Sequence, residues 1–514
     1  MLTRGLLCIC VLALCLSAPG VALASDADLF ADVLDARMPE LLAEYGVPGA
    51  VVTYIENGAV TWTHAYGLAD LETGAPMQPE MIFNHGSNGK VLTAWGVMRL
   101  VELGLVDLDA PANRYLQRWQ IQSDEFDPDG VTLRRLLSHT AGLTASGFND
   151  YGPRRRLPTL VDMLEGRNQL DGAVVIGWKP GTRFAYSGGG FVVLQMVIED
   201  VTGEPFADFM QREVIGPLGL ASLRWAWTPD PIAQAATPHG LLDEPLAYRQ
   251  LASHAIGSEV STVADFARFV AAAVAGPAGE PAGRGVLQPE TVRQMTAAQP
   301  AANGTAGLAY GLGSAAGGQL LMHFGSNAGW NAHFVIHTGQ RQGFVIANNG
   351  MRGHPLNLAV HLLWLKTVFG VSGGPAPQPA STSYGVIETI LSALAAVLAV
   401  PLLLAAAWVV WGAVTGRRRW TWPRSVRRLW PTLPWAVLAL AWWYWFYTPW
   451  PLPLPTVVPD LWWGPPIGYV MDALAAWVGF SLLAACLPAA AGARAAHPQR
   501  PVVPPPIPRE VTHA

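Results

Sequence analysis

The chain has 514 residues, 51% of them hydrophobic, and a formal net charge of −5 at neutral pH. This apolar content is too high for a purely soluble protein, so a membrane part is expected. The charge balance, and the absence of a basic stripe with interleaved aromatic residues outside the C-terminal region, argue against a nucleic-acid-binding protein.

The first 24 residues have the pattern of a secretory signal peptide. Arg4 supplies a short positive start, the apolar run "GLLCICVLALCL" follows, and "ALAS" offers a cleavage site after Ala24. Three of the four cysteines lie in this segment, so the mature chain would keep only Cys486 and form no intramolecular disulfide. The signal peptide alone therefore predicts export.

Residues 25–369 are predicted to form the body of the protein, with strands from both of its ends. Apolar spacing indicates a helix at 25–47, and two β-rich runs at 49–67 indicate a hairpin around Glu56-Asn57-Gly58. The segment 90–103 is nearly all apolar and predicts a buried helix. Further predicted elements are helices at 190–202 and 262–275, the second capped by Ser261 or Thr262, and three β-runs within 319–350. This order favours an α/β sandwich with an antiparallel sheet built from both chain ends.

The chain from residue 385 to 514 is predicted to be a membrane region, joined by a Pro/Ser/Gly-rich linker at 370–384. Three apolar segments, at about 386–414, 434–450 and 466–490, are predicted transmembrane helices. Six arginines follow the first segment, and the positive-inside rule places them and the C-terminal tail in the cytoplasm. The signal peptide leads to the same topology. We therefore expect a bacterial cytoplasmic-membrane protein whose body lies on the periplasmic or extracellular side, with the lipid bilayer as a partner.

Ser87 and Lys90 form the only Ser-x-x-Lys of the chain, where a loop enters the buried helix. A serine at a helix N-terminus meets free backbone N–H groups and the positive end of the helix dipole. Lys90 lies on the same helical face, and a desolvated ammonium can lose its proton and then take part in removing the serine proton. The alternative is an N-cap serine beside a surface lysine.

Two later residues are further candidates for proton transfer or substrate contact. Tyr186, in "WKPGTRFAYSG", precedes a predicted helix and is either a core tyrosine or a phenol that acts as a base. His323, in "HFG", begins the late strand run, where a lone histidine is usually structural.

The order of Ser-x-x-Lys, Tyr-Ser-x and His-x-Gly resembles the β-lactamase-related serine hydrolases. This class C β-lactamase-like and penicillin-binding-protein-like group includes D-alanyl-D-alanine carboxypeptidases, D-amino-acid peptidases and esterases. Further landmarks in the family's order are "GLVDLDAPANRYL", "LLSHTAGL", "FAYSGGGFVVLQMVIEDVTGEPF", "VIGPLGL", "STVADFARF" and "YGLG". The resemblance covers residues 30–350 and implies an α/β (α+β) fold, an antiparallel sheet with flanking helices plus an all-helical domain, here followed by three transmembrane helices.

Carried over residue by residue, the resemblance implies two-step acyl transfer on a peptide, amide or ester, with no metal and no cofactor. Ser87 would be the acylated nucleophile, and Lys90 and Tyr186 the proton-transfer pair. His323 would support the tyrosine or orient a substrate carboxylate. Gly325 would let the substrate lie against the strand, and the backbone N–H groups of Ser87 and Ser326 would form the oxyanion hole.

Gly188 departs from the pattern of penicillin-recognising relatives, which usually end the second motif in Asn. Glycine has no amide to bind the lysine or the substrate, which weakens the case for β-lactam hydrolysis; Asn327 or Asn88 is a candidate replacement. The competing prediction is a non-catalytic membrane protein of this fold that binds peptidoglycan or a partner. The intact Ser, Lys, Tyr and His favour the enzyme, and the sequence does not indicate an oligomeric state.

Overall fold

The computed structural model describes residues 25–371, 380–418, 426–447 and 465–487, except 154, 168–171 and 242. The described residues fall into two compact units, the first ending at Val386 and the second beginning at Ile387. The predicted signal peptide, most of the predicted linker and the predicted tail from 488 onward lie outside the described residues.

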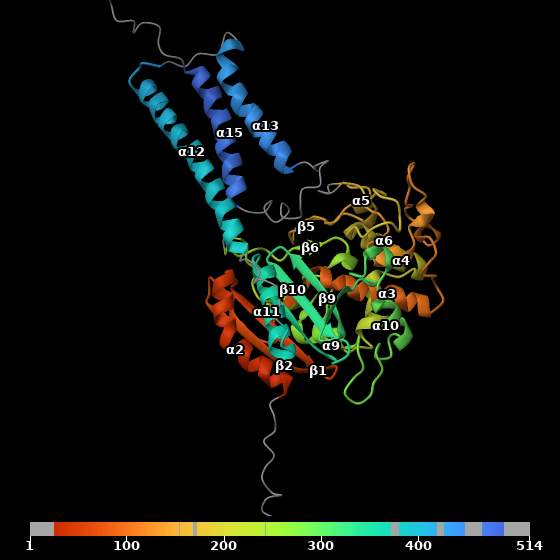
Figure 1. Cartoon of the computed structure of the whole chain (residues 1–514). Helices are drawn as coiled ribbons and strands as arrows, with labels where there is room; N and C mark the ends of the chain where they lie inside the picture. Colours follow the sequence, from red (N-terminus) through yellow and green to blue (C-terminus); the bar gives the residue numbers. More distant parts are fainter. Residues whose placement is uncertain are drawn as a thin grey trace, which may run out of the picture. The chain divides into compact units, whose positions relative to one another are not determined.

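A seven-stranded antiparallel sheet forms the centre of the first unit, in the order β3-β2-β1-β11-β10-β9-β8 (Figure 1). Its strands are β1 (Gly49–Glu56), β2 (Ala59–Asp70), β3 (Ala75–Pro76), β8 (Gly311–Ala315), β9 (Gly318–Asn327), β10 (Trp330–His337) and β11 (Gln342–Asn348). Strand β1 pairs with β11, with Ala50 opposite Asn348, so the prediction of a sheet built from both chain ends is confirmed. The predicted hairpin turns at Asn57 and Gly58, both at positive φ.

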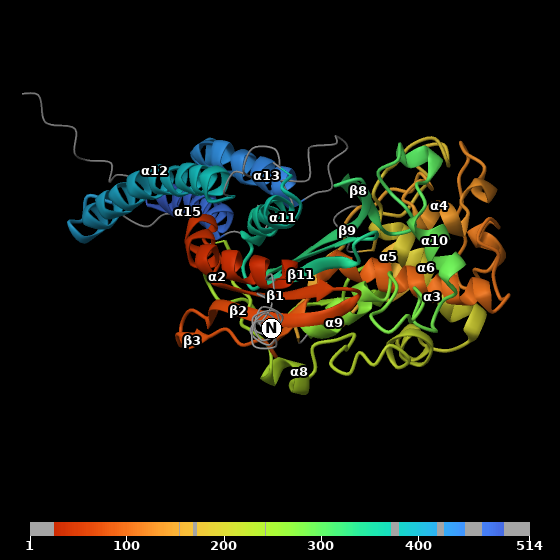
Figure 2. The same ribbon diagram turned by 60° about the horizontal axis from the view of Figure 1, so that its bottom comes forward.

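The two faces of the sheet are buried under different helices (Figure 2). Successive residues of β1 point to opposite faces, as the pleat requires. Ala50, Val52 and Tyr54 pack with helices α2 (Asp26–Tyr45) and α11 (Gly353–Phe369). Val51 and Ile55 belong to the second, larger core, which contains helix α9 (Val263–Ala271) and the helical part of the unit. The sheet therefore separates two apolar cores.

The helical part of the unit is built around two buried helices, α3 (Gly89–Glu102) and α6 (Gly188–Thr202). Smaller elements complete it: α4 (Leu133–Leu137), α5 (Leu160–Leu164), α7 (Phe206–Met210), α8 (Pro229–Ala233), α10 (Pro289–Thr296), β4 (Ile82–Asn84), β7 (Val260–Thr262), β5 (Asp150–Tyr151) and β6 (Gln250–Leu251). Helix α9 is capped by the Thr262 side chain, which accepts from the Asp265 N–H at 3.2 Å, one of the two predicted caps. It ends at Ala271 rather than near 275, because the next residues, from Ala272 onward, already form a turn ahead of Gly276 and Pro277.

The second unit contains helices α13 (Leu433–Tyr447) and α15 (Pro465–Cys486) and most of α12 (Ala380–Val414). The prediction of three transmembrane helices is corrected to one among the described residues, at Ala393–Val414. The other apolar helical segments, Leu429–Ala441 and Ala473–Cys486, have at most 17 residues. Helix α12 also begins at Ala380, inside the predicted linker.

Candidate active site

The turn that carries Ser87 is fixed by strands β4 and β7. Asn84, the last residue of β4, donates from its side chain to the Gly257 and Glu259 carbonyls at 3.3 and 3.0 Å, and accepts from the Gly86 N–H at 2.9 Å. Gly86 then turns the chain at φ +56° into the 3₁₀ turn η1 (Gly86–Asn88), which leads directly into α3. Ser87 is thus held at the mouth of a buried helix.

Ser87 and Lys90 are in direct contact, as their spacing predicts. Lys90 Nζ lies 3.0 Å from Ser87 Oγ and donates to the Ile256 carbonyl at 2.7 Å. The lysine side chain is almost fully buried, at 2% exposure, whereas Ser87 is half-buried. This arrangement leaves the serine oxygen accessible and its proton partner out of water.

Tyr186 lies beside Lys90 Nζ. Lys90 Nζ is 5.3 Å from the centre of the Tyr186 ring and 5.7 Å from that of Phe191. No described residue is hydrogen-bonded to the Tyr186 hydroxyl, and the side chain is 37% exposed. The next residue, Ser187, caps helix α6 by accepting from the Gly190 N–H at 3.1 Å and donates to the Thr144 carbonyl at 2.8 Å. Ser187 therefore fixes the turn that precedes α6, and Tyr186 is the residue of the Tyr186-Ser187 pair that lies beside Lys90.

His323 lies on β9 at the edge of this group and is neutral. Its Nδ1 is 2.7 Å from the Phe324 carbonyl, which assigns the proton to Nδ1 and leaves Nε2 as an acceptor. Burial, and to a smaller extent the charge of Lys90, lowers the pKa of His323 to about 4. Of the two roles implied by the resemblance, support of the tyrosine suits this neutral acceptor; charge pairing with a substrate carboxylate does not.

The predicted oxyanion donors come together where η1 meets β9. A Cβ added to Gly86 would lie 2.6 Å from the Ser326 backbone nitrogen, and one added to Gly325 would lie 3.0 Å from that of Ser87. The same added Cβ on Gly325 would overlap with the His85 carbonyl oxygen. Glycine at both positions lets η1 and β9 approach closely at the backbone nitrogens of Ser87 and Ser326, the two donors that an oxyanion hole at Ser87 would use.

The structure explains the departure at Gly188 and limits its replacements. A Cβ on Gly188 would lie 2.9 Å from the Ser146 carbonyl oxygen and 3.3 Å from the Phe148 ring, so this loop fills the space of a side chain. Asn327 uses its side-chain N–H groups to hold Asn84 and the Gly257 carbonyl. Asn88 is fully buried, and its amide has no partner among the described residues. Asn327 therefore anchors the nucleophile turn, and neither asparagine presents a donor to a substrate.

A cavity of about 370 Å³ adjoins the catalytic group and is lined by Tyr186 and His323. The other lining residues are His139, Phe184, Thr305, Ala306, Gly307, Ala309, Tyr310, Gly311, Leu312, Met322 and Phe324. No Asp, Glu, Lys or Arg is among them. His139 of "LLSHTAGL" and Tyr310, Gly311 and Leu312 of "YGLG" line this cavity, which the sequence did not predict.

His139 is a site residue that the sequence analysis did not identify. Its ring lies 4.3 Å from that of Tyr186, and its Nδ1 accepts from the Ser187 N–H at 3.1 Å. Burial and the charge of Lys90 lower the pKa of His139 well below its usual value, so the ring is neutral and its proton is on Nε2. His139 therefore holds the Tyr186-Ser187 turn. In the structure His139 has a φ of +55°; its position directly before Thr140-Ala141-Gly142 is the only signal that the sequence offered.

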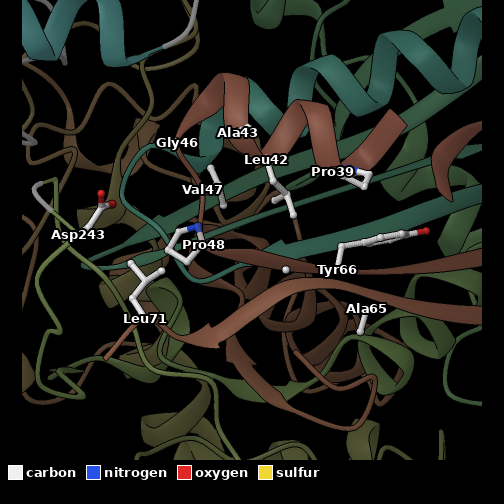
Figure 3. Close-up of a pocket in the computed structure, with 11 residues that line it drawn as sticks. Pro39, Leu42, Ala43, Gly46, Val47, Pro48, Ala65, Tyr66, Leu71 and Asp243 are labelled. Carbon is white, nitrogen blue, oxygen red and sulfur yellow. The ribbon is translucent and has the colours of Figure 1, made fainter. Parts of the chain in front are cut away.

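A larger cavity of about 620 Å³ lies elsewhere, between the end of α2 and strand β2 (Figure 3). Its lining is mostly apolar, and its one carboxylate, Asp243, pairs with Arg352. It contains none of the predicted site residues, so the smaller cavity is the candidate substrate site.

Comparisons with known proteins agree with this fold. The family described as Beta-lactamase matches residues 34–367. Esterase EstB from Burkholderia gladioli is 32% identical over 206 residues, 39% of this chain and 52% of that protein. Penicillin-binding protein 4* from Bacillus subtilis is 28% identical over 190 residues, 36% of this chain and 40% of that protein. The matches thus span about half or less of these relatives.

A solved structure, the octameric penicillin-binding protein homologue from Pyrococcus abyssi, superposes with a TM-score of 0.55 at 23% identity. The superposition covers 66% of this chain and 77% of that one, and at this identity it shows the fold alone. The family match takes in almost the whole sheet and both segments that meet at Ser87. The chain therefore belongs to the beta-lactamase family.

Proposed function

We propose that this protein is an exported, membrane-tethered serine hydrolase that forms an acyl-enzyme on Ser87. The observation that carries the proposal is the 3.0 Å contact between Ser87 Oγ and the buried Lys90 Nζ, at a helix N-terminus that also meets the Ser326 N–H. A nucleophilic serine needs a nearby proton acceptor and a pair of donors for the developing oxyanion. Lys90 would be the acceptor, and the backbone N–H groups of Ser87 and Ser326 would be the donors.

In the first step Lys90, as the neutral amine, takes the proton of Ser87 while Oγ attacks the substrate carbonyl. The backbone N–H groups of Ser87 and Ser326 stabilise the oxyanion. Tyr186, at the mouth of the cavity, passes a proton to the departing group. Water then attacks the acyl-enzyme and gives a proton to Tyr186, while Lys90 returns its proton to Ser87 Oγ, so the free acid leaves and the enzyme is regenerated.

An ester or amide without a charged group beside the scissile bond is the substrate class that the cavity favours. Its described lining has no ionised side chain, and Phe184 and Leu312 contribute apolar surface. A substrate carboxylate in this cavity would lose hydration without gaining a cation, which is costly. The space that an asparagine would need at 188 is filled by the loop of Phe148, which argues further against penicillins and peptides ending in D-Ala-D-Ala. The name of the relative EstB fits an ester substrate.

Export and anchoring are part of the proposal and rest on the sequence and one helix. The segment Ala393–Val414 is long and apolar enough to cross a bilayer, and Arg417 and Arg418 follow it directly. With this polarity the hydrolase unit lies outside the cytoplasm. In cells whose outer envelope has been opened and whose inner membrane is intact, added protease should then degrade the hydrolase unit. Full protection of that unit would refute the topology.

Active-site labelling tests the catalytic proposal on the full chain in detergent. We expect a fluorophosphonate probe to label the wild type and not Ser87→Ala, and fluorescent penicillin to label neither. Ser187→Ala, a serine of the neighbouring motif with a capping role, is the matched control and should remain labelled. If neither probe gives a Ser87-dependent adduct and no ester is hydrolysed, the protein is a binding member of the family and the proposal is wrong.

A further inference from the structure

A loop of residues 177–185 lies beside the active-site cavity and is fixed to its wall. Near the start of the loop, the Trp178 N–H donates to the Gly142 carbonyl at 3.2 Å. At its end, the Ala185 N–H donates to the His139 carbonyl at 2.7 Å. Both acceptors belong to the segment that carries the cavity-lining ring of His139. The side chains of this loop are therefore held in place at the edge of the cavity.

Phe184 and Arg183 are neighbours in this loop, and only the first of them belongs to the cavity wall. Phe184 lines the cavity, with its ring 5.7 Å from that of His139, and is also partly exposed to solvent. Arg183 and Trp178 are exposed and are not among the residues that line the cavity. Because adjacent Cα atoms are about 3.8 Å apart, Arg183 lies at the rim of the cavity.

Arg183 is held by an aromatic ring and not by a carboxylate. Its guanidinium carbon lies over the Trp178 ring, 4.0 Å from the ring centre, and it pairs with no acidic side chain in the part of the chain that the structure describes. Other arginines of the same unit, such as Arg118 and Arg134, pair with Asp or Glu. Stacking uses the face of a guanidinium and leaves its in-plane N–H donors for the two-pronged contact that a carboxylate accepts.

The other charge in this loop is also positive. Lys179 is exposed, and the Thr182 hydroxyl donates to its carbonyl at 2.7 Å, which closes the turn between Trp178 and Arg183. The sequence contains no Asp or Glu between positions 172 and 198. An anion bound at the Arg183 guanidinium would therefore meet two cations of this loop and no carboxylate of it.

We propose that Arg183, stacked on Trp178, binds a carboxylate that the substrate carries at a distance from the ester carbonyl. The described lining of the cavity has no ionised side chain, so the part of the substrate nearer to Ser87 is apolar. A carboxylate at the rim keeps contact with water and gains a cation, whereas one inside the cavity would lose water without gaining a cation. The substrate class is then an ester whose apolar chain ends in an acid. This inference rests on the proposed function, because it assumes that Ser87 attacks the ester.

A matched pair of esters tests this inference on the full chain in detergent at neutral pH. The mono-p-nitrophenyl ester of suberic acid ends in a carboxylate, and the p-nitrophenyl methyl diester of the same acid ends in a neutral group. The measured quantity is the kcat/KM of the acid divided by that of the diester, with the rate of Ser87→Ala subtracted from each. We expect Arg183→Gln to lower this ratio about two- to fivefold relative to the wild type, the effect of an exposed ion pair. Added salt should narrow the difference.

Arg37→Gln is the matched control, because Arg37 is an exposed arginine of helix α2 and its loss changes the net charge by the same amount. Its ratio should equal that of the wild type. Arg183→Glu places a like charge at the rim and should lower the ratio further than Arg183→Gln does. Ser87-dependent hydrolysis with a ratio that neither Arg183 substitution changes would overturn this inference alone. Absence of Ser87-dependent hydrolysis of both esters would overturn the proposed function and this inference with it.

Discussion

Restoring the asparagine of penicillin-recognising relatives at position 188 should destabilise this protein rather than give it a new activity. In Gly188→Asn the added Cβ would lie 2.9 Å from the Ser146 carbonyl oxygen and 3.3 and 3.4 Å from two carbons of the Phe148 ring. The loop cannot move away freely, because the Gly188 N–H donates to the same Ser146 carbonyl at 3.2 Å. The asparagine side chain must therefore displace the loop of Ser146 and Phe148 that packs against position 188.

The expected cost follows from two opposing contributions. Forcing extra atoms into a packed site costs about 1–3 kcal/mol. Replacing glycine restricts the unfolded chain and returns up to about 1 kcal/mol. The net loss is about 1–2 kcal/mol, which corresponds to a fall in Tm of about 1–3 °C for a unit of this size.

Thermal unfolding of the full chain in detergent, together with fluorescent-penicillin labelling, measures both parts of this prediction. Gly190→Ala is the control for loss of a glycine from the same helix start, because its Cβ would meet Leu136 at an ordinary 3.4 Å; its Tm should not fall. Adding Phe148→Ala to Gly188→Asn should recover part of the loss caused by the asparagine. An unchanged Tm accompanied by penicillin labelling of Gly188→Asn would refute the argument that the loop excludes a side chain here.

Three further results are expected. Gly325→Ala should separate β9 from the nucleophile turn, because its Cβ would overlap with the His85 carbonyl, and should reduce kcat about 100-fold as an oxyanion donor is displaced; wild-type kcat would contradict this geometry. Ser187→Ala should lower the unfolding free energy by about 1 kcal/mol through loss of its cap while ester hydrolysis continues, and abolished turnover in a folded variant would show a catalytic serine instead. Burial lowers the pKa of His85 to about 4, so between pH 6.5 and 4 the unfolded chain binds a proton at His85 before the folded chain does. The unfolding free energy should therefore fall by up to about 3 kcal/mol as the pH drops from 6.5 to 4. This fall should be smaller in His85→Gln, and an equal fall would argue against the lowered pKa of His85.

Elements with a regular apolar period were predictable, because the spacing of apolar residues along a helix or strand follows from its local geometry and not from its partners. The helix beginning near residue 25, the hairpin that turns at Asn57-Gly58 and the three late strands all appear where their patterns indicated them. Strand β8 was missed because its sequence, "GLGSA", has no alternation and few strand-forming residues. The membrane prediction was wrong in number: among the described residues one segment, Ala393–Val414, is long and apolar enough to span, and the apolar segments after it are shorter.

The Ser87–Lys90 contact was predictable because three residues on one helical face are neighbours by geometry alone. The rest of the site depends on contacts across the chain: Lys90 binds the carbonyl of Ile256, 166 residues away. Glu259 gave no signal for the same reason. Its complete burial and its contact with the backbone of Gly89 are not visible in a run such as "IGSEVST".

The pairing of β1 with β11 also sets the time at which the protein can acquire activity. Ala50 finds its partner only when Asn348 has been synthesised, and the backbone N–H of Ser326 is also supplied late. Contacts of such large sequence separation form slowly and cannot form on a partly made chain. A nascent chain released or stalled before about residue 350 therefore holds Ser87 and Lys90 without a finished oxyanion hole. Under the proposed function, hydrolysis begins only after nearly the whole unit has been synthesised.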